Sequence, residues 1–141
     1  MRISLTFILL ALTLQLSTAQ EMSTDSLGFQ TFEMTEGDTT YVMKQYFIAF
    51  LKTGPNRDHN EAEAAKIQAG HLAHMNTLAE QKKVCVAGPL GDDEELRGIV
   101  IYNVATLEEA KAVVKADPAV IAGRLDVEVH PWWAAKGSKL Y

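Results

Sequence analysis

The residues best suited to proton transfer in this chain are its four histidines, His59, His71, His74 and His130. Imidazole is the side chain whose ordinary pKa lies closest to neutrality, so it can both accept and donate a proton there. On a helical wheel of about 100° per residue, His71 points near the middle of an apolar arc and His74 falls at its margin. The arc consists of Ala64, Ile67, Leu72, Met75, Leu78 and Ala79. We therefore expect His71 to face the interior of the domain.

A carboxylate with a similar placement occurs later in the chain, at Asp117. The same wheel puts Asp117 on the apolar face of a second helix, together with Leu107, Ala110, Val113 and Val114. Burying a lone histidine or a lone carboxylate is costly, whereas a hydrogen-bonded pair satisfies both groups. The pattern predicts that His71 and Asp117 meet. The pair would be either a catalytic dyad or a structural contact between a core histidine and a carboxylate at a helix end.

Metal binding is a weaker interpretation of the same residues. His71 and His74 are three residues apart on one helix, but His130 belongs to a distant strand and Asp92 to a loop, so no third ligand is evident. We predict no metal site and no bound cofactor. Cys85 lies in a short apolar strand without a neighbouring base, which favours an inert core thiol.

The elements that must position these residues are indicated by local patterns. Apolar strand segments, turn residues and helix caps predict a strand at 46–51, a helix from Asn60 to Lys82, strands at 84–87 and 98–102, a helix from Thr106 to Asp117 and a strand at 125–130. Glu109 follows Thr106 by three residues, as in a capping box. The run 91–95, with four consecutive acids, is typical of a solvated loop. The order βαββαβ predicts an α+β fold: a ferredoxin-like antiparallel sheet with both helices on one face.

Such a sheet has a second, bare face, and this predicts a homodimer with the two sheets face to face. The interface would contain Val84, Val86, Ile99 or Val100, and Ile101 or Tyr102, depending on the strand register. Trp132 and Trp133 would either extend this interface or cover the cavity beside His71.

Composition excludes several classes of protein. The chain has 141 residues, of which 48% are apolar and 22% are charged, which is typical of one folded domain. Its net charge of −5 argues against nucleic-acid binding, which depends on clustered Lys and Arg. A single cysteine excludes an intramolecular disulfide and a zinc site of several thiolates.

The N-terminus has the pattern of a secretory signal peptide over residues 1–19. Arg2 is followed by an uncharged apolar run at 3–16 and by small residues that favour cleavage after Ala19. About 14 apolar residues are too few to span a bilayer, so we expect export to the periplasm or beyond the cell rather than membrane anchoring. Residues 20–40 carry five acids and no Lys or Arg and show no strand or helix period, which predicts a flexible acidic arm. An alternative is an arm that docks Phe29 and Phe32 on the domain.

Short segments spread along the chain, at 71–80, 86–90, 107–111, 116–123 and 131–132 with Gly98 between them, resemble the YCII-related (YciI-like) family. The resemblance covers about residues 42–133. It places the domain at 41–133 and leaves 134–141 as a C-terminal tail. It implies a dimeric α+β barrel and an active site formed by His71 and Asp117. The chain departs from the family at Gln68, where many relatives have Arg, and at Lys82-Lys83, where relatives tend to have Gly.

Two functions remain open at this point. The first is an enzyme of isomerase or lyase type that acts on a small molecule without a cofactor, with His71 as general base and Asp117 fixing its tautomer. The second is a non-catalytic homodimer that binds a small ligand or serves as an accessory protein, in which the pair is structural.

Overall fold

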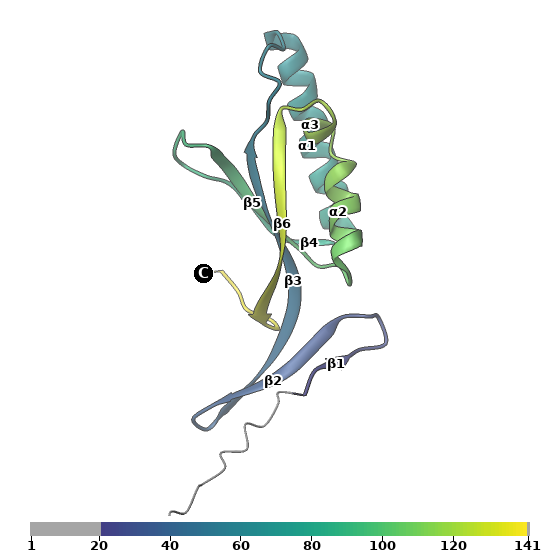
Figure 1. Ribbon diagram of the computed structural model, residues 1–141, viewed down its shortest axis with the longest axis vertical. Coiled ribbons are helices and arrows are strands. Elements are labelled where there is room, and N and C mark those ends of the chain that lie inside the picture. The colour runs from purple at the N-terminus through teal and green to yellow at the C-terminus, as the bar shows by residue number, and fades with distance from the viewer. Residues whose placement is uncertain (1–20, 141) are drawn as a thin grey trace, which may run out of the picture.

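The computed structural model describes residues 21–140, so the predicted signal segment 1–19 lies outside the described residues. Figure 1 shows the helices together on one side of a twisted sheet. The strands are β1 Ser23–Thr24, β2 Gln30–Glu36, β3 Thr39–Thr53, β4 Val84–Pro89, β5 Leu96–Tyr102 and β6 Leu125–Ala135. The helices are α1 Glu61–Glu80, α2 Leu107–Lys115 and α3 Pro118–Ile121. No helix in the described part of the chain is long and apolar enough to cross a membrane.

The sheet confirms the predicted α+β topology. From β3 onward the order of elements is βαββαβ, apart from the additional short helix α3. The strands lie in the order β4-β5-β3-β6, and every pairing is antiparallel. β3 and β5 are therefore the central strands, and they carry the most buried side chains of the sheet. This is the ferredoxin-like arrangement expected from the sequence.

The segment before the domain differs from its prediction. Residues 30–36 are not a flexible arm, because β2 pairs with the first half of β3 along the same edge that β5 uses further on. Phe32 packs on Trp133 of β6 with ring centroids 4.9 Å apart. The Lys44 ammonium lies 3.6 Å from the centre of the Phe29 ring. The docked alternative therefore describes this segment. This strand was missed in the sequence because only two apolar residues, Phe32 and Met34, alternate with polar ones in β2, within a segment that is otherwise acidic and polar.

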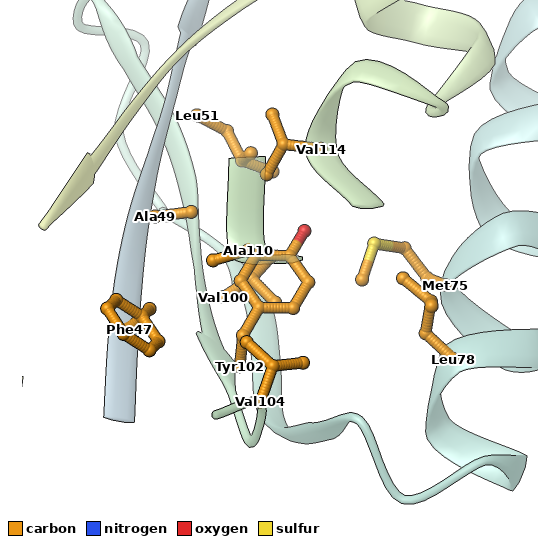
Figure 2. Close-up of a cluster of buried hydrophobic side chains, with 10 residues drawn as sticks. All are labelled: Phe47, Ala49, Leu51, Met75, Leu78, Val100, Tyr102, Val104, Ala110 and Val114. Atoms are coloured by element: carbon orange, nitrogen blue, oxygen red, sulfur yellow. The ribbon is translucent and has the colours of Figure 1, made fainter. Parts of the chain in front are cut away.

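The core lies between the sheet and the helices. Phe47, Ala49 and Leu51 alternate along β3 and point toward the helices, and Val100 and Tyr102 do the same on β5. Figure 2 shows these side chains facing Met75 and Leu78 of α1, and Ala110 and Val114 of α2. The period of two on the strands and the helical spacing on α1 and α2 bury one face of each element.

The helix caps agree with the sequence with one exception. Asn60 and Glu63 form a reciprocal capping box at the start of α1. At α2, the Thr106 side chain accepts a hydrogen bond from the Glu109 N–H, but the Glu109 carboxylate accepts from the N–H of Ala105, at 3.4 Å, instead of closing the predicted box. α2 also ends at Lys115, two residues before the predicted end, so Asp117 lies outside it.

The face of the sheet away from the helices carries a continuous apolar patch, which we call the open face. Ile48 and Phe50 alternate with the buried residues of β3, and Ile101 and Ile99 are their respective partners on β5. Val86 pairs with Ile101 and extends the patch onto β4. The open face therefore consists of these five residues.

Val84 was predicted on the open face and is instead on the other side. A register shift between Val84 and Val86 turns Val84 toward the helices, where it pairs with Tyr102 and packs against the core. The same irregularity leaves Cys85 exposed, so its prediction as a core thiol is wrong. Partial burial nevertheless raises the pKa of the Cys85 thiol, against the opposing effect of the Lys44 charge.

Candidate active site

His71 and Asp117 meet as the sequence predicts. The Nδ1 atom of His71 lies 2.7 Å from the Oδ2 atom of Asp117. The His71 side chain is 12% exposed and the Asp117 side chain 4%, so water competes little for this contact. His71 comes from the middle of α1 and Asp117 from the connection between α2 and α3. The pair therefore joins two helical segments that lie on the same face of the sheet.

Asp117 is held in place by the local sequence as well as by His71. It is the N-cap of α3, with extended backbone angles, and Pro118 follows at the first helical position. Its Oδ1 atom accepts a hydrogen bond from the Ala119 N–H at 2.8 Å, which leaves Oδ2 for the histidine. α3 can approach α1 because Gly70 faces Pro118. A Cβ atom at position 70 would lie 3.1 Å from the Pro118 ring.

The charge state of the pair is set by these contacts. Burial raises the pKa of Asp117, but the hydrogen bonds from His71 and Ala119, with the charges of His71 and His74, outweigh it and lower that pKa below its usual value. An ionised carboxylate accepts hydrogen bonds only, so Nδ1 of His71 must be the protonated nitrogen. In the neutral ring, Nε2 then carries the free lone pair. Asp117 therefore fixes the tautomer in which His71 can act as a base.

Two further polar groups surround the dyad. His74, at the margin of the helical arc, donates from Nε2 to the Val113 carbonyl oxygen at 2.9 Å, which ties α1 to α2. Tyr102 is fully buried in the core beneath the helices (Figure 2). Burial, and then the Asp117 carboxylate, raise the pKa of its hydroxyl well above the usual value. The Tyr102 hydroxyl therefore stays neutral, and the negative charge of this region remains on Asp117.

His71 borders a cavity of about 560 Å³ between α1 and the end of the sheet. This volume is in the range of small-molecule sites. Much of its wall is apolar, from Leu51, Ile67, Leu72, Met75, Val100 and Leu125. Leu72 is 52% exposed, so its place in the predicted buried arc is corrected: it forms part of the cavity wall instead of the core. Asp117 does not line the cavity but contacts the His71 ring, which does.

The remaining candidate ligands do not gather at this site. His74 faces Val113, and His130 lies on β6 opposite Ile48, with its ring edge-on to Phe50 on the open face. Among residues 21–140, no group of three or more His, Cys, Asp or Glu could hold a metal ion. The Nδ1 atom of His59 is buried without a hydrogen-bond partner in that part of the chain. The predicted exposed position of the acidic run at 92–95 agrees with the structure.

Three residues of the cavity wall were missed in the sequence: Arg57, Arg97 and Arg124. Arg57 follows β3, Arg97 lies on β5 and Arg124 immediately precedes β6. They are far apart in the sequence and none belongs to a recognisable motif. Only the strand pairing brings them to one end of the sheet.

The fold is that of a small α+β protein with an antiparallel sheet, and sequence comparison identifies the family. Residues 46–133 match the model of the YCII-related domain. The chain is 30% identical over 64 residues to the uncharacterized protein YjpA of Bacillus subtilis (strain 168), a match that covers 45% of this chain and 73% of the relative. The chain belongs to the YCII-related family.

A solved structure also resembles this one. It is 5-chloro-2-hydroxyhydroquinone dehydrochlorinase from Burkholderia phenoliruptrix AC1100, in complex with 2,5-dihydroxybenzoquinone. The sequences are 25% identical, the TM-score is 0.48, and the match covers 62% of this chain and 92% of the other.

Proposed function

We propose that this protein is an enzyme that moves protons on a small organic molecule by general acid–base catalysis. The observation that carries the proposal is the 2.7 Å contact between His71 Nδ1 and a buried carboxylate, in a histidine that also lines a cavity. The contact leaves Nε2 as the basic atom of the ring. Isomerisation and elimination both suit this arrangement, because each begins with removal of a proton by a positioned base.

In the proposed reaction, Nε2 of His71 accepts a proton from the bound molecule. The ring then becomes an imidazolium, and the ionised Asp117 at 2.7 Å stabilises the new positive charge. In an isomerisation, His71 returns the proton to another atom of the same molecule. In an elimination, the C–H electron pair forms a double bond, the leaving group departs with its bonding pair as an anion, and His71 later releases its proton to solvent. The pair is largely shielded from water, since the side chains of His71 and Asp117 are 12% and 4% exposed, and this strengthens their electrostatic contact.

The test is a screen of small hydroxylated and lactone compounds for turnover, with the purified protein and its His71→Ala variant. We expect turnover to fall by about 10²- to 10⁴-fold in the variant, the usual contribution of a general base. His130→Ala is the matched control because His130 contacts Phe50 of the open face and does not line the cavity. It should retain full turnover. Undiminished turnover in His71→Ala would contradict the assignment.

One observation favours the second candidate function, a non-catalytic ligand-binding protein. Asp117 is also the N-cap of α3, so the carboxylate has a structural use independent of any reaction. A structural pair predicts binding without turnover for every compound of the screen. It also predicts that the His71→Ala variant loses stability but no chemical activity.

We also propose that two copies of the chain associate through the open face. Support comes from the five apolar side chains of this face and from the position of the helices, which cover only the opposite face of the sheet. Identical faces paired about a two-fold axis are the commonest arrangement in oligomers. Light scattering of the purified protein at micromolar concentration should give the mass of a dimer. A monomer at that concentration would contradict the proposal.

Export is a further proposal, and it rests on the sequence of residues 1–19 alone. N-terminal sequencing of the protein from its native host should begin at Gln20 or within one or two residues of it. Recovery of the intact Met1 in a cytosolic fraction would contradict export.

A further inference from the structure

The arginines of the chain are distributed in an unusual way. The sequence contains four, of which Arg2 lies in the predicted signal segment. The other three, Arg57, Arg97 and Arg124, all line the cavity beside His71. By contrast, none of the nine lysines, all within residues 21–140, lines this cavity. Arginine is the side chain whose planar group pairs with a carboxylate through two parallel hydrogen bonds.

The strand register explains why three arginines that are far apart in the sequence line one cavity. Lys52 near the end of β3 pairs with Leu96 of β5, and Thr53 pairs with Leu125 of β6. Arg97 follows Leu96 in the sequence and Arg124 precedes Leu125. Arg57 comes four residues after Thr53. The three side chains thus belong to one end of the sheet. His71 borders the same cavity from α1.

The backbone around Arg57 and Arg124 is held rigidly together. The Gly54 N–H donates to the Arg124 carbonyl oxygen at 2.9 Å, and Nη1 of Arg57 donates to the same oxygen at 3.1 Å. This approach requires glycine at position 54, because a Cβ atom there would lie 2.2 Å from the Gly123 carbonyl oxygen. The two arginines are therefore neighbours on the wall of the cavity.

Their positive charge is poorly neutralised by the protein. No Asp or Glu lines the cavity among the described residues, although the whole chain has a net charge of −5. The Arg124 guanidinium has no ion-pair or hydrogen-bond partner in the described part of the chain. Arg97 lies 3.9 Å from the fully exposed carboxylate of Asp93, a contact that solvent screens. Like charges grouped without a counterion favour the binding of an anion.

We propose that the cavity binds a small carboxylic acid with an apolar ring, whose carboxylate is held by Arg57, Arg97 and Arg124. This inference rests on the proposed function, because the acid it names would be the substrate of the reaction at His71. The apolar wall accommodates the ring, and the arginines hold the carboxylate at the sheet end of the cavity. The ring atoms are thereby placed toward Nε2 of His71. These three arginines are binding residues that set specificity and orientation.

The probes are benzoate and its neutral isostere benzamide, titrated into the purified protein and followed by calorimetry and by the His71 imidazole resonances in NMR spectra. We expect benzoate to bind and to shift the His71 resonances, and benzamide to bind at least about tenfold more weakly, because it cannot form charge-assisted contacts with arginine. Inorganic phosphate should also bind more weakly than benzoate, because it leaves the apolar wall unfilled.

The variants Arg57→Gln, Arg97→Gln and Arg124→Gln should each weaken benzoate binding, by about tenfold for Arg124. Lys111→Gln removes the same charge from an exposed position on α2 and should leave binding unchanged. Equal binding of benzoate and benzamide, phosphate binding as strong as benzoate binding, or arginine variants that bind like the parent would each overturn the proposal. So would the absence of benzoate binding at millimolar concentration.

The two proposals fail in different experiments. Benzoate binding does not require a reaction, and it should persist in His71→Ala. If the parent protein turns over no compound of the screen, the proposed enzyme activity is therefore refuted, but the acid-binding site is not. If the arginine variants bind benzoate as tightly as the parent does, the proposed substrate class is refuted, but proton transfer by His71 is not.

Discussion

The substitution Asp117→Asn isolates the role of the carboxylate because it changes one atom and the charge. An asparagine oxygen can still accept the hydrogen bond from the Ala119 N–H, so the cap of α3 is retained. Its amide nitrogen, placed where Oδ2 lies 2.7 Å from His71, is a donor. Nδ1 of His71 must then be the acceptor, and the ring proton moves to Nε2. The base of the proposed reaction is thereby blocked while the fold is kept.

The expected loss of stability is moderate. A hydrogen bond to a charged group contributes about 1.5–3 kcal/mol, and the new neutral bond to Asn recovers part of it, which leaves a loss of about 1–2 kcal/mol. Little discount for solvent is needed, because the Asp117 side chain is 4% exposed. For a domain of this size the melting temperature should fall by roughly 5–10 °C. Turnover, where a substrate is in hand, should fall by about 10³- to 10⁴-fold because the tautomer is wrong.

The loss should also depend on pH in a defined direction. The folded pKa of Asp117 is lowered, so the carboxylate stabilises the fold above its unfolded pKa of about 4. That contribution disappears as the pH falls through the folded pKa. The stability difference between parent and variant should therefore be largest near neutral pH and shrink in acid.

The assay combines thermal unfolding between pH 2 and 7 with nitrogen NMR of the His71 ring, which distinguishes the two tautomers. Asp92→Asn is the matched control, since Asp92 is an exposed residue of the acidic loop. It should change neither the tautomer nor the pH profile. A variant whose His71 keeps its proton on Nδ1, or whose deficit grows in acid, would refute the account of the dyad.

Two further predictions concern the sheet. Ile48→Glu places a charge in the middle of the open face and should convert the dimer into a monomer, as measured by light scattering. The control Ile121→Glu, on the exposed side of α3, should remain a dimer. An unchanged mass for Ile48→Glu would exclude this face as the interface. Gly54→Ala forces a Cβ atom against the Gly123 carbonyl oxygen and should lower the free energy of unfolding, measured with a chemical denaturant, by about 1–3 kcal/mol. The control Gly91→Ala should be nearly neutral, because its Cβ atom would meet no atom within 4 Å. Equal stabilities of the two variants would contradict the close approach at Gly54.

The parts of this structure that can be predicted from the sequence are those specified by neighbouring residues. Asn60 caps the first helix as expected, and the apolar runs at 46–51 and 98–102 lie in the central strands β3 and β5. Both runs are apolar on successive residues, so the sequence left open which side chains of β5 face the helices. The His71–Asp117 contact was predictable because each residue interrupts the apolar face of its own segment. The exact end of α2 was not, because Asp117 continues the helical spacing but serves as the cap of a new short helix.

The parts that could not be predicted depend on pairing between distant segments. The register shift beside Cys85 reverses the direction of Val84 and leaves no signature in the local sequence. β2 is stabilised by β3 and by the contact of Phe32 with Trp133, not by its own pattern. In its seven residues QTFEMTE only Phe32 and Met34 alternate with polar residues, and a pattern this short does not distinguish a strand from a loop. The acidic and polar composition of this segment therefore gives no information about the strand and the aromatic ring that it contacts.

The candidate site also has one part that neighbouring residues specify and one part that depends on the pairing of distant strands. The pair that would move the proton is encoded locally, by one histidine on a helix and one aspartate before a proline. The groups that would hold the substrate come from the ends of three strands, and only the antiparallel register aligns them. Gln68, one helical turn before His71, lines the cavity with a neutral side chain. The charge on the wall comes instead from the sheet end, so a substrate's carboxylate and its reacting atoms would be held by different layers of the fold. Proton transfer and substrate choice can then vary independently, since changing an arginine on a strand end leaves the His71–Asp117 contact between the helices in place.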